Sequence, residues 1–185
     1  DPKTLSQAHR RFVPGYPQIW RALAVFCAIS VPRSVGTKAV TAPARRPITA
    51  TDAELEDLQQ RHPALLRAGE LKRAQLIYDA RREWTFGTRD LPPRDLERAA
   101  LLAHRWNWHD RAIFTAGRSG HLDDLELRFP VLHTREVLRA SGNLGIDPSW
   151  VMGVMRQESA FIADVRSSAG ALGLMQLMPG TGADM

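Results

Sequence analysis

Signals that start and stop helices recur through residues 51–159, and they constrain the fold more than any other feature of this sequence. The segment "PPRDLERAALLAHRW" opens with proline, which is favoured in the first turn of a helix. It then places apolar residues at intervals of three and four, namely Leu96, Ala99, Leu102 and Trp106. Residues 51–130 contain no alternating apolar run long enough for a strand. The chain is therefore predicted to be mainly α-helical.

Further helices are predicted on both sides of this segment. At Thr51, "TDAE" has the spacing by which a hydroxyl and a carboxylate satisfy the free amides of a helix start. A single helical stripe is formed by Leu71, Ala74, Gln75, Tyr78 and Arg82. "HDRAIFTAG" predicts a short helix that ends at Gly117. Such successive short helices suggest a solenoid, although no repeat of fixed length is present.

Two more helices are expected near the C-terminal end. One runs from about residue 131 to 140 and stops at "SGNLG", where Gly142 and Asn143 can adopt the left-handed conformation. The next follows Asp147, a suitable N-cap, and has Pro148 at its first position.

The first fifty residues differ in charge from the rest of the chain. They carry eight Lys or Arg and one acid, and the remaining chain has 17 basic and 19 acidic residues. A basic leader could contact a polyanion or could be a solvated tail. Residues 32–50 have the composition of a linker, and the apolar run 22–31 is too short to span a bilayer. Cys27 lies in that run and is predicted to be a buried thiol without a disulfide.

Glu158 is the most informative residue of the second half. It is spaced by three and four residues from Met155 and Val151, so the helix would place its carboxylate on an apolar face. Loss of water penalises the charged form of a carboxylate, so the spacing predicts a carboxyl group that keeps its proton. A general acid needs that proton. The alternative is that Glu158 points into solvent or pairs with a nearby arginine.

The segment "SSAGALGLMQLMPGT", residues 167–181, follows Glu158 closely. It combines small residues with one amide, Gln176, that offers both a donor and an acceptor. This composition is typical of a cleft wall that binds an uncharged polar polymer such as a sugar.

Together, "RQESAF" and this segment resemble the catalytic signature of the soluble lytic transglycosylases, bacterial enzymes with a goose-type lysozyme fold that cleave peptidoglycan. The resemblance covers roughly residues 130–185, and "ELRFP" at 126–130 is similar to the sequence that precedes the domain in that family. It implies that Glu158 is the single catalytic acid and base. It also assigns substrate contacts to Ser159, Ser167, Gln176, Met178 and Thr181.

In this family such a glutamate would protonate the oxygen between N-acetylmuramic acid and N-acetylglucosamine. It would then remove the proton of the muramic acid 6-hydroxyl as that oxygen closes on C1. The product would be a 1,6-anhydro ring, and neither a cofactor nor a second carboxylate is implied. Asp164, the only nearby carboxylate, is interpreted as a loop cap or a surface charge.

The resemblance also organises the chain. It implies a basic leader and linker over 1–50, a helical, superhelical linker region over 51–130, and the N-terminal part of a lysozyme-like catalytic domain over 131–185. This last domain is expected to be C-terminally incomplete. The expected partners are peptidoglycan glycan strands, with no nucleic acid and no transmembrane segment, in the periplasm or outer cell envelope.

Two other functions remain open at this stage. The chain could bind peptidoglycan without cleaving it, if its cleft is incomplete. The helix, turn and helix of 134–159 also resemble a DNA-binding motif in outline, although Arg156 would be the only cation at hand on the second helix. No metal is expected, because His104 and His109 are five residues apart and no HExxH motif occurs.

Overall fold

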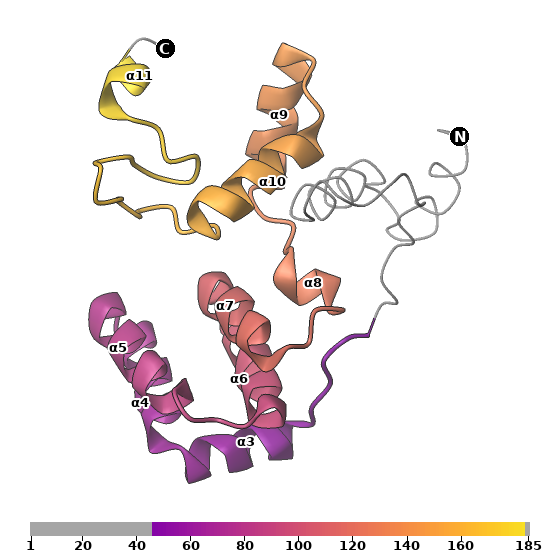
Figure 1. The fold of residues 1–185 in the computed structure, drawn as a ribbon, viewed down its shortest axis with the longest axis vertical. Coiled ribbons are helices and arrows are strands. Elements are labelled where there is room, and N and C mark those ends of the chain that lie inside the picture. Colours follow the sequence, from indigo (N-terminus) through magenta and orange to yellow (C-terminus); the bar gives the residue numbers. More distant parts are fainter. Residues whose placement is uncertain (1–45, 184–185) are drawn as a thin grey trace, which may run out of the picture. The chain divides into compact units, whose positions relative to one another are not determined.

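The computed structural model describes residues 46–183, and these residues form helices and no strand (Figure 1), which confirms the predicted mainly helical class. The predictions for Cys27, for the apolar run 22–31 and for most of the linker lie outside the described residues. The described elements are α3 (Asp52–Arg61), α4 (Pro63–Arg73), α5 (Ile77–Thr88), α6 (Pro93–Arg105), α7 (His109–Ser119), α8 (Leu125–Arg128), α9 (Thr134–Leu144), α10 (Pro148–Ser159) and α11 (Pro179–Ala183).

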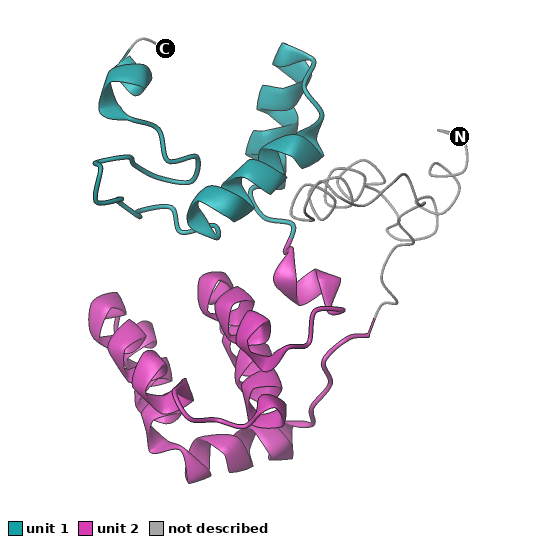
Figure 2. Cartoon of the chain, viewed as in Figure 1, with its two compact units in different colours: residues 1–43, 131–185 teal, residues 44–130 magenta. Residues whose placement is uncertain are grey.

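These helices fall into two compact units, which Figure 2 shows in different colours. The first, here called the linker unit, holds α3 to α8 and ends at Pro130. The second, here called the motif unit, begins at Val131 and holds α9, α10, α11 and the loop before α11. Among the described residues no helix is long and apolar enough to cross a bilayer.

The linker unit is built from packed helix pairs, with α4 against α5 and α6 against α7. Its centre is a group of three tryptophans. The Trp84 ring meets Trp106 edge-on at a centroid distance of 5.9 Å and Trp108 at 5.5 Å. Small residues let the helices approach this group, because a Cβ atom on Gly69 would lie 2.7 Å from the Trp106 ring. The buried core also contains Ile48, Leu58, Leu65, Ala80, Leu96, Ala99, Ala100, Ala103, Ala112 and Leu127.

Local signals define where several elements begin. The capping box predicted at Thr51 is present, with the hydroxyl of Thr51 accepting from the amide of Glu54 and the Glu54 carboxylate accepting from the amide of Thr51. Asp124 caps α8 through the amide of Leu127 and also accepts from the amide of Ile48 at 2.8 Å. The described end of the predicted linker is therefore attached to the core through Ile48, which is buried.

The stripe predicted over residues 71–82 is wrong, because those residues belong to two helices. Helix α4 ends at Arg73 and α5 begins at Ile77, and Gln75 between them adopts a left-handed φ of 62°. The amide of Leu76 donates to the carbonyl of Leu71, which closes the turn. Reversing the chain here lets α5 pack back along α4, and burial of both apolar faces outweighs continuation of a single helix.

Two predicted helix ends are also wrong, and both helices continue for longer. Helix α7 passes through Gly117 and ends at Ser119, followed by Gly120. Helix α9 includes Gly142 and Asn143, and its left-handed C-cap is Gly145 with a φ of 64°. Glycine pays no steric penalty in that conformation, but the sequence alone does not say which of two nearby glycines takes it.

The motif unit has a much smaller core. Helices α9 and α10 pack together around Val137, Met152 and Met155, with further half-buried apolar side chains against them. The predicted start of α10 is confirmed, since the carboxylate of Asp147 accepts from the amide of Ser149 and Pro148 is the first helical residue. After α10 the chain runs through a long loop, residues 160–178, to the short helix α11 (Figure 1).

Candidate active site

Glu158 lies in the last turn of α10, and its side chain is exposed. Met155, one turn earlier, is buried and Val151 is half-buried, so the apolar face exists but does not extend to Glu158. The prediction that this face desolvates the carboxylate is therefore wrong for the described chain. Helical spacing puts Glu158 on the same side as Met155, but desolvation also requires a neighbouring element, and no other segment of the motif unit covers it.

Ser159, the next residue, is buried and holds the end of the helix. Its hydroxyl donates to the carbonyl of Met155 at 2.9 Å and accepts from the amide of Phe161 at 3.1 Å. Both bonds are within the protein, so in this structure the hydroxyl serves the backbone and not Glu158. Ser159 thus fixes the position at which the chain leaves the helix, directly after the predicted catalytic residue.

The turn after Ser159 is strained. Ala160 and Phe161 both have a left-handed φ, of 49° and 66°, which costs residues with a Cβ atom of the order of 1 kcal/mol each. Phe161 packs against the cluster that contains Met152 and Met155, and this contact offsets the strain. The same conformation occurs at Gln75, Asn107, His133 and Gln176, so it is not specific to the segment after Glu158.

Ser167 and Gln176 belong to one hydrogen-bonded loop. Ser167 exchanges bonds with Ala171, its backbone amide donating to the carbonyl and its hydroxyl accepting from the amide, both at 3.0 Å. The side-chain nitrogen of Gln176 donates to the carbonyls of Gly173 at 2.9 Å and Val165 at 3.3 Å. The structure brings these two predicted residues into the same loop, but their polar groups mainly hold the loop itself.

Met178 and Thr181 lie beyond this loop, and both are exposed. Thr181 is in α11, whereas Met178 immediately precedes that helix. Leu172 and Leu177, which exchange two backbone hydrogen bonds at 2.9 and 3.1 Å, are exposed as well. These two leucines were not among the predicted site residues, because the sequence does not show which apolar residues of the loop are exposed.

The electrostatics of the motif unit are simple. Among the described residues no partner is found for the carboxylate of Glu158, so the predicted alternative of pairing with an arginine is not observed, whereas exposure to solvent is. Asp164 is exposed, as expected for a surface charge. No group of three or more His, Cys, Asp or Glu in the described part of the chain is placed to hold a metal ion.

The clearest pKa changes occur in the linker unit. Hydrogen bonds from the backbone amide of Thr51 and from the guanidinium of Arg98 lower the pKa of Glu54 to about 2. The hydrogen bond from Arg61 likewise lowers the pKa of Asp95. These groups form a surface ion-pair network between α3 and α6, so their shifts reflect structure and not catalysis.

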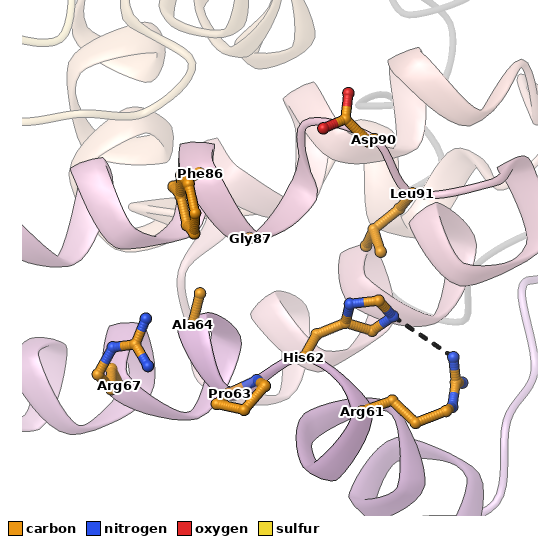
Figure 3. Close-up of a pocket in the computed structure, with 9 residues that line it drawn as sticks. All are labelled: Arg61, His62, Pro63, Ala64, Arg67, Phe86, Gly87, Asp90 and Leu91. Carbon is orange, nitrogen blue, oxygen red and sulfur yellow. Dashed lines mark hydrogen bonds between the residues drawn. The ribbon is translucent and has the colours of Figure 1, made fainter.

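A pocket of about 320 Å³ lies in the linker unit, between α4 and α5 (Figure 3). None of the predicted site residues lines it. The sequence analysis missed it because its lining comes from three separate segments: the end of α3, the first turns of α4, and the end of α5 with the following turn.

Comparison with known families gives two matches in chain order. Residues 58–125 match the soluble lytic murein transglycosylase L domain, and residues 137–185 match the transglycosylase SLT domain. The first match lies within the linker unit and the second within the motif unit.

Individual relatives agree with these families. The soluble lytic murein transglycosylase of Salmonella typhimurium is 34% identical over 119 residues, which are 64% of this chain and 18% of that protein. An inactive mutant of the lytic transglycosylase Slt from Pseudomonas aeruginosa has a similar structure, with a TM-score of 0.72 and 32% identity over 98% of this chain and 30% of that one. The 70 kDa soluble lytic transglycosylase of Escherichia coli gives 0.62 and 26% identity, over 98% and 26%. The chain thus spans less than a third of these relatives.

Proposed function

This chain belongs to the soluble lytic murein transglycosylase family, and from that premise we propose that it carries the acid and base of a peptidoglycan lytic transglycosylase, Glu158. The observation that carries the proposal is the SLT domain match over 137–185, which includes Glu158 and the loop that follows it.

The proposed reaction needs only one carboxyl group. Glu158 gives its proton to the glycosidic oxygen between N-acetylmuramic acid and N-acetylglucosamine, and the bond from that oxygen to C1 breaks. The resulting carboxylate takes the proton of the muramic acid 6-hydroxyl while O6 bonds to C1. Glu158 ends protonated, as it began, and no water is consumed. A hydrolase would instead require a water molecule and, in most cases, a second carboxylate.

Exposure of Glu158 is compatible with this role if the glycan itself covers the carboxylate. A sugar bound over the end of α10 would displace water and favour the protonated form. The loop of Ser167 and Gln176 is proposed to be one wall of that cleft, because its internal hydrogen bonds hold it in a fixed shape. Met178 and Thr181 are proposed to contact the glycan through their exposed side chains.

Ser159 is proposed to help catalysis by orienting Glu158. Its two hydrogen bonds fix the turn after Glu158, and therefore the direction in which the carboxylate leaves the helix. The domains are proposed to follow the same division, with a helical linker region over 51–130 and a partial catalytic domain over 131–185. The proposed location is the periplasm or outer cell envelope, where the substrate is found.

The test is mass spectrometry of purified peptidoglycan after incubation with the chain, beside Glu158→Gln and a Gln157→Glu control. Gln157 is the exposed residue before Glu158, so this control alters charge without touching the proposed acid. The proposal expects anhydromuramic ends from the unmodified chain and from the control, and none from Glu158→Gln. Ordinary reducing ends would replace the mechanism with hydrolysis.

A second candidate is peptidoglycan binding without cleavage. The specific observation in its favour is that no other segment of the motif unit covers Glu158, so its carboxylate lacks the water-free surroundings that catalysis usually uses. Sedimentation of the folded chain with purified cell wall, together with the absence of any new glycan ends, would establish this function in place of the enzymatic one.

A further inference from the structure

The pocket of the linker unit exists because α4 and α5 approach closely at one point. A Cβ atom on Gly87 would lie 2.9 Å from the Cβ of Ala64, so only glycine allows this approach. Beyond it Phe86 and Leu91 stand on one side, and His62 and Pro63 on the other (Figure 3). The result is an open hollow whose lining combines apolar side chains with arginines, a histidine and one acid.

Phe86 is the unusual residue of this pocket. Its side chain is 63% exposed although it lines the hollow, and the guanidinium of Arg89 lies 6.0 Å from its ring centroid. The face of an aromatic ring is electronegative, so it attracts cations and the polarised C–H groups on one face of a pyranose ring. An exposed ring beside a hollow of this size suits a sugar.

The rim of the pocket carries two arginines, and both are paired with carboxylates. Arg61, Arg67 and His62 line it together with one acid, Asp90. Arg61 is held by Asp57 and Asp95, whereas Arg67 has one carboxylate partner, the half-buried Glu83, which its Nε and Nη2 contact at 3.0 and 2.9 Å. Arg67 can therefore exchange that partner for a ligand carboxylate at little cost, since exposed ion pairs contribute little.

The aromatic and basic character continues along α5. Tyr78, Arg82 and Phe86 are four residues apart, so they lie on one face, and all three side chains are exposed. The guanidinium of Arg82 lies 5.9 Å from the Tyr78 ring. Eight residues of helix extend about 12 Å, so a ligand that contacts both Tyr78 and Phe86 would have more than one sugar unit.

We propose that this pocket and the adjoining face of α5 bind a carboxylate-bearing saccharide segment, as offered by muramic acid with its stem peptide. The identity of the ligand rests on the proposed function, but the pocket belongs to the linker unit and Glu158 to the motif unit. The aromatic rings contact the sugar faces, and Arg67 pairs with a carboxylate. A dense polyanion fits less well, because residues 51–185 carry 17 basic and 19 acidic residues.

Isothermal titration of the 185-residue chain with a soluble N-acetylglucosamine–N-acetylmuramic acid tetrapeptide tests the proposal. All variants carry Glu158→Gln, so the ligand is not consumed. Phe86→Ala and Arg67→Gln are each expected to weaken binding about tenfold, which corresponds to the loss of one cation–π or charge-assisted contact. Phe114→Ala is the matched control, because Phe114 is exposed under Arg111 in the same way but does not line the pocket.

A neutral chitin tetramer serves as the second probe. It is expected to bind more weakly than the muramic ligand, and its affinity is expected to be unchanged by Arg67→Gln. Circular dichroism of each variant checks that the helices are retained. We expect them to be, because Phe86 and Arg67 are both exposed.

Three results would overturn the proposal. The first is unchanged binding of the muramic ligand by Phe86→Ala. The second is equal affinity for the neutral chitin tetramer, and the third is tighter, Phe86-dependent binding of single-stranded RNA. A chain that carries Phe86→Ala and retains Glu158 could still cleave peptidoglycan in each of these cases. Failure of the binding proposal is therefore distinct from failure of the proposed reaction.

Discussion

The linker unit and the motif unit hold their chains in different ways. The linker unit is organised around three tryptophans and a set of small residues that let helices meet closely. The motif unit has three buried apolar residues in its α9–α10 cluster, and its loop is shaped by hydrogen bonds and left-handed residues. Apolar packing thus stabilises the linker unit, whereas hydrogen bonds shape the loop that follows Glu158 in the motif unit.

The largest expected effect tests the core of the linker unit. Trp84 is 2% exposed and its indole nitrogen donates to the hydroxyl of Thr115 at 3.1 Å. Trp84→Ala should lower the free energy of unfolding of this unit by about 3–5 kcal/mol, because it removes buried area and leaves a cavity. Urea denaturation followed by circular dichroism measures it. Tyr78→Ala, at an exposed position of α5, should cost about 0.5 kcal/mol or less.

A smaller effect is expected from the same kind of change in the motif unit. Met152→Ala should cost about 2 kcal/mol, at the low end for such substitutions, since its half-buried neighbours can move into the space. Hydrogen exchange of the α9 and α10 amides measures it locally. If Met152→Ala lowered the free energy of unfolding as much as Trp84→Ala does, the two cores would contribute equally to stability and the contrast between the units would be wrong.

The loop should respond to a change that leaves its volume constant. Gln176→Glu removes the side-chain donor to the carbonyls of Val165 and Gly173, and we expect a local loss of about 1–2 kcal/mol. Faster hydrogen exchange over residues 165–177 would report it. Gln157→Glu makes the same chemical change at an exposed position of α10 and should leave these rates unchanged.

The smallest expected effect is on the stability of the linker unit at acidic pH. The folded pKa of Glu54 is about 2, below its ordinary value of 4.5, so its contribution to stability is present above pH 4.5 and is lost as the pH falls towards 2. Glu54→Gln should therefore make the stability of the linker unit less dependent on pH in this window. Thermal unfolding at pH 6, 4 and 2.5 measures the dependence, and an equal slope in both proteins would contradict the assignment.

Several features of the fold were predictable because their causes are local. The capping box at Thr51 and the start of α10 at Asp147 and Pro148 require contacts only three or four residues apart. The helical class follows from periodicity, and the family from a motif with fixed spacing between Glu158 and Thr181.

Other features were mispredicted because they depend on competition between distant segments. The break at Gln75 exists because α5 gains more by packing on α4 than by extending it. The end of α9 falls at Gly145 and not at Gly142, a choice between two residues with the same local preference. The predicted burial of Glu158 failed because helical spacing gives a direction but not the presence of a neighbour.

The sequence by itself therefore determined the helical class, the family and the identity of the candidate acid, since each is written in residues close together along the chain. Only the tertiary structure decided that Glu158 is exposed, that Ser159 and Gln176 use their polar groups to hold the backbone, and that a pocket forms beside Phe86. The physical reason is that burial and partner choice are set by segments that fold together from distant positions, which no local pattern encodes.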